Sequence, residues 1–212
     1  MFSPKALEVI ARLEAADSKR NARSVGPHSF WRIPRDLGNL MYVMCAYGSA
    51  SIGVEIGSGA GYSSIFIGSA LATKGGHLFT FEEDPTKAEL AESYLSQAGL
   101  EATVTVICAD AREALPASLT EKDLRWDFAF IDGHKSDYRD YFELLLSYRA
   151  RTAMVVADNV GAPHAEAVAP FLSYISKLPF TTTFVSIHDA TTGEADAAAV
   201  SLLDTEEVQH GR

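Results

Sequence analysis

The sequence predicts an α/β protein with a doubly wound, mostly parallel, seven-stranded sheet that ends in an antiparallel hairpin. Five short apolar runs alternate with longer runs of helical periodicity, and these five runs are apolar throughout. Strands of that kind, alternating with helices, indicate a parallel sheet that is covered on both faces. The last two strand-like runs are separated only by a turn-rich stretch, which indicates an antiparallel pair at the sheet edge.

The composition is that of a single domain with a substantial core, which we expect to span 1–212. The chain has 212 residues, of which 47% are hydrophobic and 22% charged. No apolar run approaches the roughly 18 residues needed to cross a bilayer, and the first residues do not resemble a signal peptide. The net charge of −10 argues against general nucleic-acid binding. We therefore expect a cytoplasmic protein that binds neither nucleic acid nor membrane.

Residues 1–50 are expected to form two helices and a lid. Ser3 and Pro4 are typical of a helix start. Apolar residues then recur at helical spacing in two stretches: Leu7, Ile10 and Leu13, followed by Leu37, Leu40, Met41 and Met44. The stretch between them has no period and carries five basic residues: Lys19, Arg20, Arg23, Arg32 and Arg35. This basic stretch is either a solvated surface or a lid that attracts an anionic substrate.

Residues 51–204 are expected to form the core of alternating elements. The predicted strands are IGVEI, HLFTF, TVTVI, DFAFI and AMVVA, followed by the hairpin strands FTTTFVSIH and AAAVSLL. The predicted helices lie at 61–73, 85–98, 136–150 and 163–178. In such sheets ligands bind at the carboxyl ends of the strands, so residues at those ends are the candidates for function.

A glycine-rich turn, VEIGSGAGYSS, follows the first strand of the core. Gly57, Gly59 and Gly61 allow the backbone to turn sharply and approach a ligand. Tyr62 takes the place of the last glycine of the dinucleotide-binding pattern. Glu82 ends the next strand, where a carboxylate can accept hydrogen bonds from both hydroxyls of a ribose. This context of strand, turn and helix predicts a site for a nucleoside cofactor.

Two further strands end in carboxylates, Asp132 and Asp158, and Asn159 follows the second. Their oxygens are hard ligands of the kind that suits Mg²⁺, Mn²⁺ or Ca²⁺. Lys135 lies three residues after Asp132, close enough to act as a base beside a metal ion. Asp110 follows the third strand, either to meet an adenine amino group or simply to cap a helix. The residues together indicate a metal-assisted group-transfer enzyme.

The motifs VEIGSGAGYSS, TFEEDP, CADA, FIDGHKSDY and VVADNV resemble, in order and spacing, those of the class I S-adenosylmethionine-dependent methyltransferases. More narrowly, the chain looks like the cation-dependent O-methyltransferases, the group that contains catechol and caffeoyl-CoA O-methyltransferases. The resemblance covers roughly residues 34 to 203 and implies a Rossmann-like methyltransferase fold. It implies S-adenosylmethionine as cofactor, a divalent cation with Mg²⁺ as the first choice, and a small aromatic acceptor that bears hydroxyl groups.

The resemblance also implies a role for individual residues. The expected cofactor-binding residues are Glu55, Gly57, Ser58, Ser63, Glu82, Asp110, Ala111, Asp132 and His134. The expected metal ligands are Asp132, Asp158 and Asn159, and the expected catalytic base is Lys135. A neighbouring positive charge disfavours the ammonium form of a lysine, so a metal-bound site would allow Lys135 to accept a hydroxyl proton.

The acceptor pocket is expected in the loops 23–35, 159–164 and 188–196. Phe30, Trp31 and Arg32 either cover an aromatic acceptor or pack the loop onto the body. Glu194 or Asp196 is expected to accept a hydrogen bond from a free hydroxyl of the acceptor. The chain lacks a Gly-Gly turn before the fifth strand and a tryptophan after Asn159, both of which relatives carry, so the pocket is the least defined part of the prediction.

Four other functions are consistent with parts of the sequence. The acceptor could be a hydroxylated uridine in tRNA, which the basic segment favours and the acidic balance disfavours. A metal-independent methyltransferase would use Asp132 and Asp158 for cofactor or substrate. A nicotinamide-dependent oxidoreductase is disfavoured by Tyr62 and by the terminal hairpin. The intact lysine disfavours a non-catalytic binding module. The first two helices offer apolar faces that could pair two subunits into a homodimer.

Overall fold

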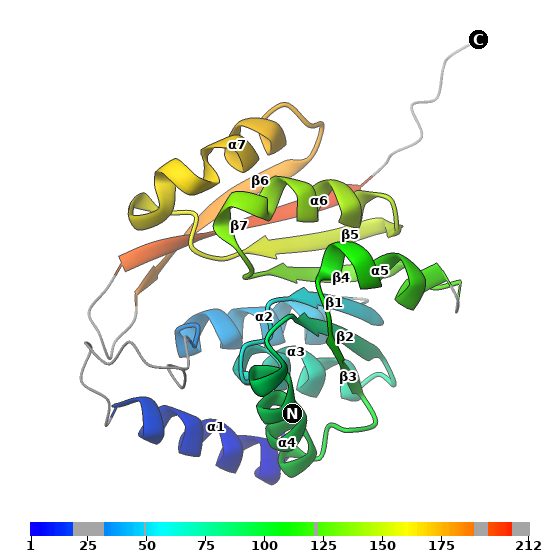
Figure 1. The fold of residues 1–212 in the computed structure, drawn as a ribbon, viewed down its shortest axis with the longest axis vertical. Coiled ribbons are helices and arrows are strands. Elements are labelled where there is room, and N and C mark those ends of the chain that lie inside the picture. The colour runs from blue at the N-terminus through cyan, green and yellow to red at the C-terminus, as the bar shows by residue number, and fades with distance from the viewer. Residues whose placement is uncertain (19–31, 49, 121–122, 189–194, 205–212) are drawn as a thin grey trace.

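The computed structural model describes residues 1–18, 32–48, 50–120, 123–188 and 195–204. Its seven strands form one sheet in the order β3-β2-β1-β4-β5-β7-β6 (Figure 1). The strands are β1 (Ile52–Ile56), β2 (His77–Glu82), β3 (Val104–Cys108), β4 (Trp126–Ile131), β5 (Arg149–Ala157), β6 (Thr181–His188) and β7 (Ala195–Asp204).

Neighbouring strands among β1 to β5 pair in parallel, whereas β7 is antiparallel to both β5 and β6. The predicted fold class and terminal hairpin are therefore confirmed. The hairpin does not simply extend the edge, because β7 lies between β5 and β6 and β6 is the outer strand. The start of β7 is consequently brought beside the end of β5, close to Asp158.

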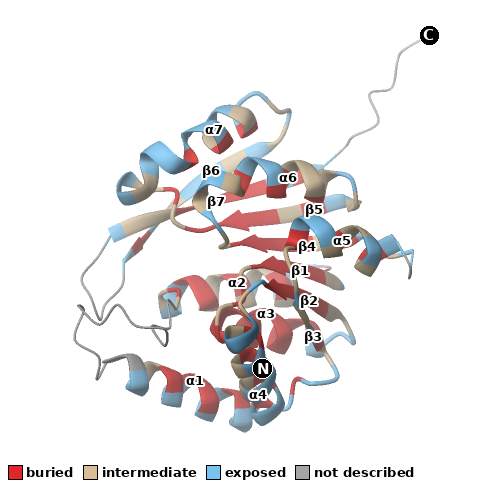
Figure 2. Ribbon diagram, in the orientation of Figure 1, coloured by how far each residue is buried: buried red, intermediate tan, exposed pale blue. Residues whose placement is uncertain are grey.

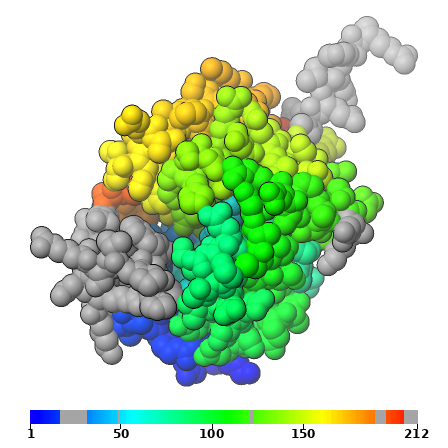
Figure 3. All heavy atoms as spheres, viewed as in Figure 1, coloured from blue at the N-terminus to red at the C-terminus, as the bar shows by residue number. Residues whose placement is uncertain are grey.

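Helices cover both faces of the sheet (Figures 1 and 2). One layer contains α1 (Pro4–Ser18), α2 (Arg35–Tyr47), α3 (Tyr62–Ala72) and α4 (Pro85–Ala98). The other contains α5 (Ala111–Thr120), α6 (Tyr138–Leu146) and α7 (Ala165–Ile175). The space-filling view shows α4 to α7 forming a continuous surface on the near side (Figure 3). The continuous apolar strands are explained by these two layers, since both sheet faces are buried.

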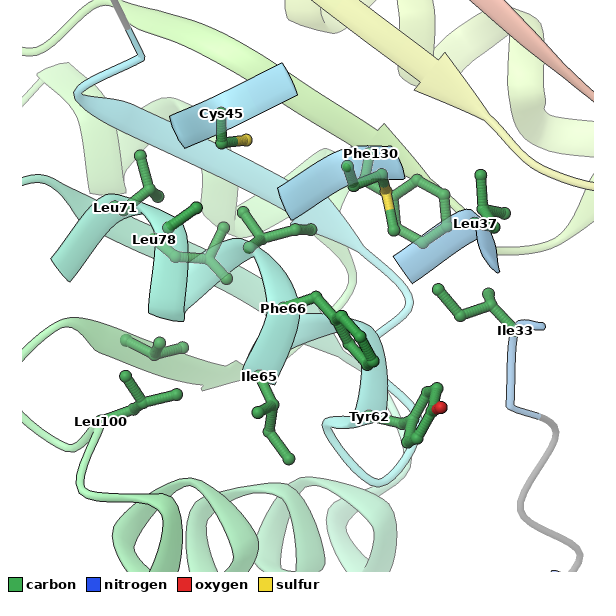
Figure 4. Packing of buried hydrophobic residues seen from close by; sticks show 14 of the residues in the cluster. Ile33, Leu37, Cys45, Tyr62, Ile65, Phe66, Leu71, Leu78, Leu100 and Phe130 are labelled. Atoms are coloured by element: carbon green, nitrogen blue, oxygen red, sulfur yellow. The ribbon is translucent and has the colours of Figure 1, made fainter. Parts of the chain in front are cut away.

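The core between the sheet and the first helical layer is built from large apolar side chains. Leu37, Phe66 and Phe130 come from α2, α3 and β4 and point into the same layer (Figure 4). Gly38 lets α2 lie against α3, since a Cβ at this position would be 2.9 Å from the ring of Phe66. The hydroxyl of Ser3 accepts a hydrogen bond from the backbone N–H of Ala6 at 3.0 Å and so caps α1, as the sequence predicts.

Several sequence-based expectations are wrong in detail. The helix expected at 136–150 is shorter, because residues 135–137 form a 3-10 turn and β5 begins at Arg149. Pairing of Arg149 with Trp126 of β4 overrides the local pattern there, as tertiary context commonly does. Leu7 is exposed on α1, where Ala6 and Val9 are buried instead. In the described part of the chain, no helix is long and apolar enough to cross a membrane.

Candidate active site

The glycine-rich turn connects β1 to α3 at the carboxyl edge of the sheet. Gly57, Gly59 and Gly61 have φ values of 91°, 51° and 84°, a left-handed region that favours glycine. The N–H of Gly57 donates to Phe81 O at 2.9 Å, which ties the turn to β2. A Cβ on Gly57 would be 2.5 Å from Asp132 O, whereas one on Gly59 would meet nothing within 4 Å. The turn therefore packs tightly against the end of β4 and leaves open space beside Gly59.

Glu55 lies completely buried beneath this turn. Its Oε2 accepts hydrogen bonds from the hydroxyls of Ser64 and Thr80, the latter at 2.7 Å. Burial raises the pKa of Glu55, and the nearby hydroxyls of Ser63, Ser64 and Thr80 partly offset that rise. Its Oε1 is buried and has no hydrogen-bond partner among the described residues. A buried acceptor without a donor is costly, so this oxygen is available to a donor on a bound ligand.

Glu82 supports the turn from the end of β2. Its Oε2 accepts from the N–H of Gly59 at 2.8 Å, and its Oε1 accepts from the N–H of Asp84 at 3.0 Å. A carboxylate has about four lone-pair sites, so Glu82 can still accept hydrogen bonds from two hydroxyls. This capacity agrees with the ribose-binding role that the sequence predicts. Ser58, in the turn itself, is also buried.

Asp110 precedes α5, whose first residue Ala111 is buried. The N–H of Arg112 donates to Asp110 Oδ1 at 2.8 Å, and the guanidinium of Arg112 donates to both oxygens of the same carboxylate. These hydrogen bonds lower the pKa of Asp110. Arg112 also donates to Asp137 Oδ2 at 2.9 Å. Asp110 is thus a helix cap held by an arginine, and its contact with an adenine amino group stays a prediction.

The residues predicted to act as the base and the metal ligands lie at the ends of β4 and β5, which are neighbouring parallel strands. Lys135 Nζ donates to Asp132 Oδ1 at 2.7 Å and to the hydroxyl of Tyr138 at 2.9 Å. That hydroxyl in turn donates to Asp158 O at 3.0 Å. Burial raises the pKa of Tyr138 well above its ordinary value, so it remains a phenol. Tyr138 thereby positions the lysine between the two strand ends.

The surroundings of Asp132 and Asp158 disfavour the ionised form of both carboxylates. Burial, followed by the charge of Asp132, raises the pKa of Asp158 to about 7. Burial also raises the pKa of Asp132, against the lowering effect of Lys135. A buried carboxylate, Asp158, beside a partly buried one, Asp132, favours a bound cation. The donor set of two carboxylates and the amide of Asn159 suits Mg²⁺, Mn²⁺ or Ca²⁺.

His134 lies at the surface of the same edge, where its Nε2 is 2.7 Å from Glu83 Oε1. Both side chains are more than half exposed, at 64% and 54%. The pair links the loop after β4 to the loop after β2, on either side of the expected cofactor. The ring of His134 is thus paired with a carboxylate, and its contact with the cofactor stays a prediction.

Among the described residues, no group of three or more histidine, cysteine, aspartate and glutamate side chains is placed to hold a metal ion. The predicted ligand set contains only two such side chains, with an amide as the third. Phe30, Trp31 and Glu194, the expected pocket residues, lie outside the described residues. The sequence interpretation missed Thr80, Ser64 and Tyr138 as supports of functional groups, because each acts through a partner that is distant in the chain or on another element.

The unpartnered Glu55 Oε1 leads to a binding prediction. Glu55→Gln is expected to weaken S-adenosylhomocysteine binding by about 10- to 100-fold, because hydrogen bonds to charged groups contribute about 1.5–3 kcal/mol. Isothermal titration calorimetry measures the change. Glu143→Gln, an exposed carboxylate on α6 that pairs with Arg139, is the matched control. Equal affinities for wild type and Glu55→Gln would contradict the role of this side chain.

The raised pKa of Asp158 predicts how stability depends on pH. The folded protein holds this proton up to about pH 7, whereas the unfolded chain releases it near 3.8. The contribution of Asp158 to the free energy of unfolding of the metal-free protein therefore falls as the pH rises from about 4 to about 7. Asp158→Asn should flatten that decline in melting temperature, and Mg²⁺ should stabilise wild type more at pH 8 than at pH 5. The same pH slope in both proteins would refute this account.

The fold and the strand-end residues define a class I methyltransferase architecture. Residues 9–164 match the O-methyltransferase family model, which is most of the chain. The chain therefore belongs to the O-methyltransferase family, and the resemblance found in the sequence is confirmed.

Individual relatives and solved structures agree with this assignment. The chain is 37% identical over 107 residues to a catechol O-methyltransferase of Niastella koreensis, an overlap of 50% of this chain and 48% of the relative. It is 28% identical over 153 residues to a caffeoyl-CoA O-methyltransferase of Populus kitakamiensis, covering 72% and 63% respectively. The chain thus spans about half to two thirds of the length of these curated relatives.

Solved structures share the fold over nearly the whole chain. The O-methyltransferase TomG from Streptomyces achromogenes, in complex with SAM, has a TM-score of 0.78 at 24% identity, and the match covers 97% of this chain and 92% of that one. The O-methyltransferase from Bacillus cereus, in complex with SAH, has a TM-score of 0.76 at 24% identity, covering 96% and 92%.

Proposed function

We propose that this protein transfers a methyl group from S-adenosylmethionine to a hydroxyl of a small catechol-like acceptor, with the help of a divalent cation. The single observation that carries the proposal is the contact between Gly57 and Asp132, where a Cβ would be 2.5 Å from the Asp132 carbonyl. It puts the glycine-rich turn directly against the loop that carries Asp132 and Lys135. A cofactor beside the turn would therefore lie next to the candidate base.

The proposed cofactor fits the residues on the turn side of the site. The free Oε1 of Glu55 offers an acceptor to the ammonium group of an amino acid. Glu82 has lone pairs left for the ribose hydroxyls, and the space beside Gly59 admits a ligand. The relatives solved with SAM and with SAH support the same choice of cofactor.

In the proposed methyl transfer, the protein removes a proton and positions the reactants. When bound, the cofactor supplies the reactive methyl group and the cation lowers the pKa of an acceptor hydroxyl. Lys135 would take the hydroxyl proton at Nζ and so leave the acceptor oxygen as the nucleophile for the methyl group that the cofactor would supply. Asp132, Asp158 and Asn159 would hold the cation, and Tyr138 orients Lys135. Positioning the two reactants accounts for most of the acceleration.

A catechol-like acceptor is proposed for a chemical reason. A hard cation such as Mg²⁺ binds about six oxygen atoms, so three protein ligands would leave room for the two oxygens of a vicinal diol. The catechol and caffeoyl-CoA O-methyltransferases among the relatives support the choice.

A panel of catechols tests the acceptor class. With S-adenosylmethionine and Mg²⁺, mass spectrometry should detect a product that carries one added methyl group on oxygen. If S-adenosylhomocysteine binds but no catechol is methylated, the catechol proposal fails and undermodified tRNA becomes the next acceptor to test.

A homodimer remains part of the proposal. Leu7 of α1 and Val43 and Tyr47 of α2 are exposed large hydrophobic side chains, which supply apolar surface on the two helices expected to pair. Light scattering distinguishes a dimer from a monomer directly.

A further inference from the structure

We propose that Asp196 is a positioning residue that fixes the side-chain amide of Asn159, so that Oδ1 rather than Nδ2 is left to bind the cation. The inference rests on the proposed function, because it assigns a residue that orients one of the proposed ligands. It differs from the sequence-based expectation for Asp196, which was a hydrogen bond from the acceptor's hydroxyl.

The orientation of the amide follows from what a carboxylate can do. Asn159 Nδ2 donates to Asp196 Oδ2 at 3.0 Å. An ionised carboxylate only accepts hydrogen bonds, whereas an amide has one accepting and one donating end. The nitrogen must therefore face Asp196. The oxygen of Asn159, the only atom of its side chain that can bind a hard cation, is left on the other side of the amide.

Asp196 is itself held in place by the backbone. Its Oδ1 accepts from the N–H of Gly161 at 2.8 Å and from its neighbour Ala197 at 2.7 Å. A Cβ on Gly161 would be 2.3 Å from this oxygen, so only glycine permits the approach. Val160 N–H also donates to Ala197 O at 2.9 Å, which joins the loop to the start of β7. These contacts hold Asp196, at the start of β7, in place beside Asn159.

The loop after β5 needs this support. Asn159 has a φ of 54°, the left-handed region that non-glycine residues adopt rarely but asparagine tolerates. Partners outside the ligand set typically orient metal ligands, and their loss weakens metal binding. Asp196 already accepts three hydrogen bonds within the protein, which leaves only about one of the four lone-pair sites of a carboxylate for an acceptor hydroxyl.

The hydrogen-bond pattern makes a specific prediction for Asp196→Asn. The new amide would keep its oxygen on the N–H groups of Gly161 and Ala197 and turn its nitrogen toward Asn159. Asn159 would then flip to accept with Oδ1 and present Nδ2 to the cation. The exchange of both residues, Asp196→Asn with Asn159→Asp, restores a donor opposite an acceptor and leaves a carboxylate oxygen for the cation.

Mn²⁺ binding to the full chain tests this without any turnover. The protein is first treated with a chelator to remove bound metal ions. Mn²⁺ is then added, and the concentration of free Mn²⁺ is measured by electron paramagnetic resonance. Asp196→Asn is expected to weaken Mn²⁺ binding by about 10- to 100-fold, and the double exchange to recover most of the loss. Asp204→Asn, a carboxylate at the exposed end of β7 that accepts from Thr152, is the matched control and should bind as wild type does.

The possible outcomes distinguish the positioning role of Asp196 from the proposed cation site itself. Wild-type affinity in Asp196→Asn, or no recovery in the double exchange, would overturn the positioning role alone. If Asp196→Asn does not fold, Gly161→Ala replaces it, because a Cβ at this position would be 2.3 Å from Asp196 Oδ1 and would displace the carboxylate without changing any charge. Gly161→Ala must then bind Mn²⁺ more weakly than wild type, and wild-type affinity in this variant would overturn the positioning role. Absence of Mn²⁺ binding in wild type would overturn the proposed cation and this inference together.

Discussion

Replacing Lys135 with methionine is expected to lower kcat for methyl transfer by about 10²- to 10⁴-fold, the range for loss of a positioned general base. The side chain is held by Asp132 and Tyr138 at the ends of β4 and β5, beside the proposed cation ligands. Methionine has a similar length but neither a proton acceptor nor a charge. Steady-state kinetics with S-adenosylhomocysteine detection measure the loss.

The affinity for S-adenosylhomocysteine should change little in Lys135→Met, because the turn-side contacts of the cofactor are intact. Lys177→Met, on an exposed residue after α7, is the control for loss of a lysine elsewhere. Added alkylamines should restore part of the activity of Lys135→Ala if the missing group is a base. Near-wild-type turnover in Lys135→Met would remove the residue from the mechanism.

Asp158→Asn is expected to reduce turnover at fixed Mg²⁺ by about 10²-fold or more, since a bound cation contributes several kcal/mol of charge stabilisation in such reactions. The carboxylate is 3% exposed and follows Ala157 at the end of β5. An amide keeps its size but loses its charge, so higher Mg²⁺ concentrations should recover part of the activity. Turnover as a function of Mg²⁺ concentration measures both effects.

The matched control for Asp158→Asn is Asp140→Asn, an exposed carboxylate on α6. Binding of S-adenosylhomocysteine should be similar in both variants and wild type. A fall in turnover that no concentration of Mg²⁺ relieves, with unchanged Mn²⁺ affinity, would argue that Asp158 contacts substrate and not a cation.

The sequence was sufficient for the parts of the site that follow local rules. Apolar strands that end in Asp132 and Asp158 necessarily bring both carboxylates to one edge of a parallel sheet. The order of the strands, most of the helices between them, and the cap formed by Asp84 on α4 also follow from local patterns, whereas α5 (Ala111–Thr120) is not among the predicted helices. The cysteines show the limit of such reasoning: cysteine is commonly a small core residue, and Cys45 is buried, but Cys108 is exposed at the end of β3.

The contacts that the sequence could not predict are all tertiary. Asp196 meets Asn159 only because β7 inserts between β5 and β6, and the sequence does not reveal that insertion. Thr80 reaches Glu55 because β1 and β2 pair in register. The helix expected at 136–150 ends early because Arg149 pairs with Trp126 of β4 in the sheet. Local periodicity carries no information about such partners.

The most direct test of the central claim is the formation of S-adenosylhomocysteine from S-adenosylmethionine and catechols, with Mg²⁺ and again with EDTA. The proposed mechanism predicts turnover with Mg²⁺, its loss in EDTA, and its return when Mg²⁺ is added in excess. Turnover that is indifferent to EDTA would contradict the roles proposed for Asp132, Asp158 and Asn159, and would identify the protein as a metal-independent methyltransferase.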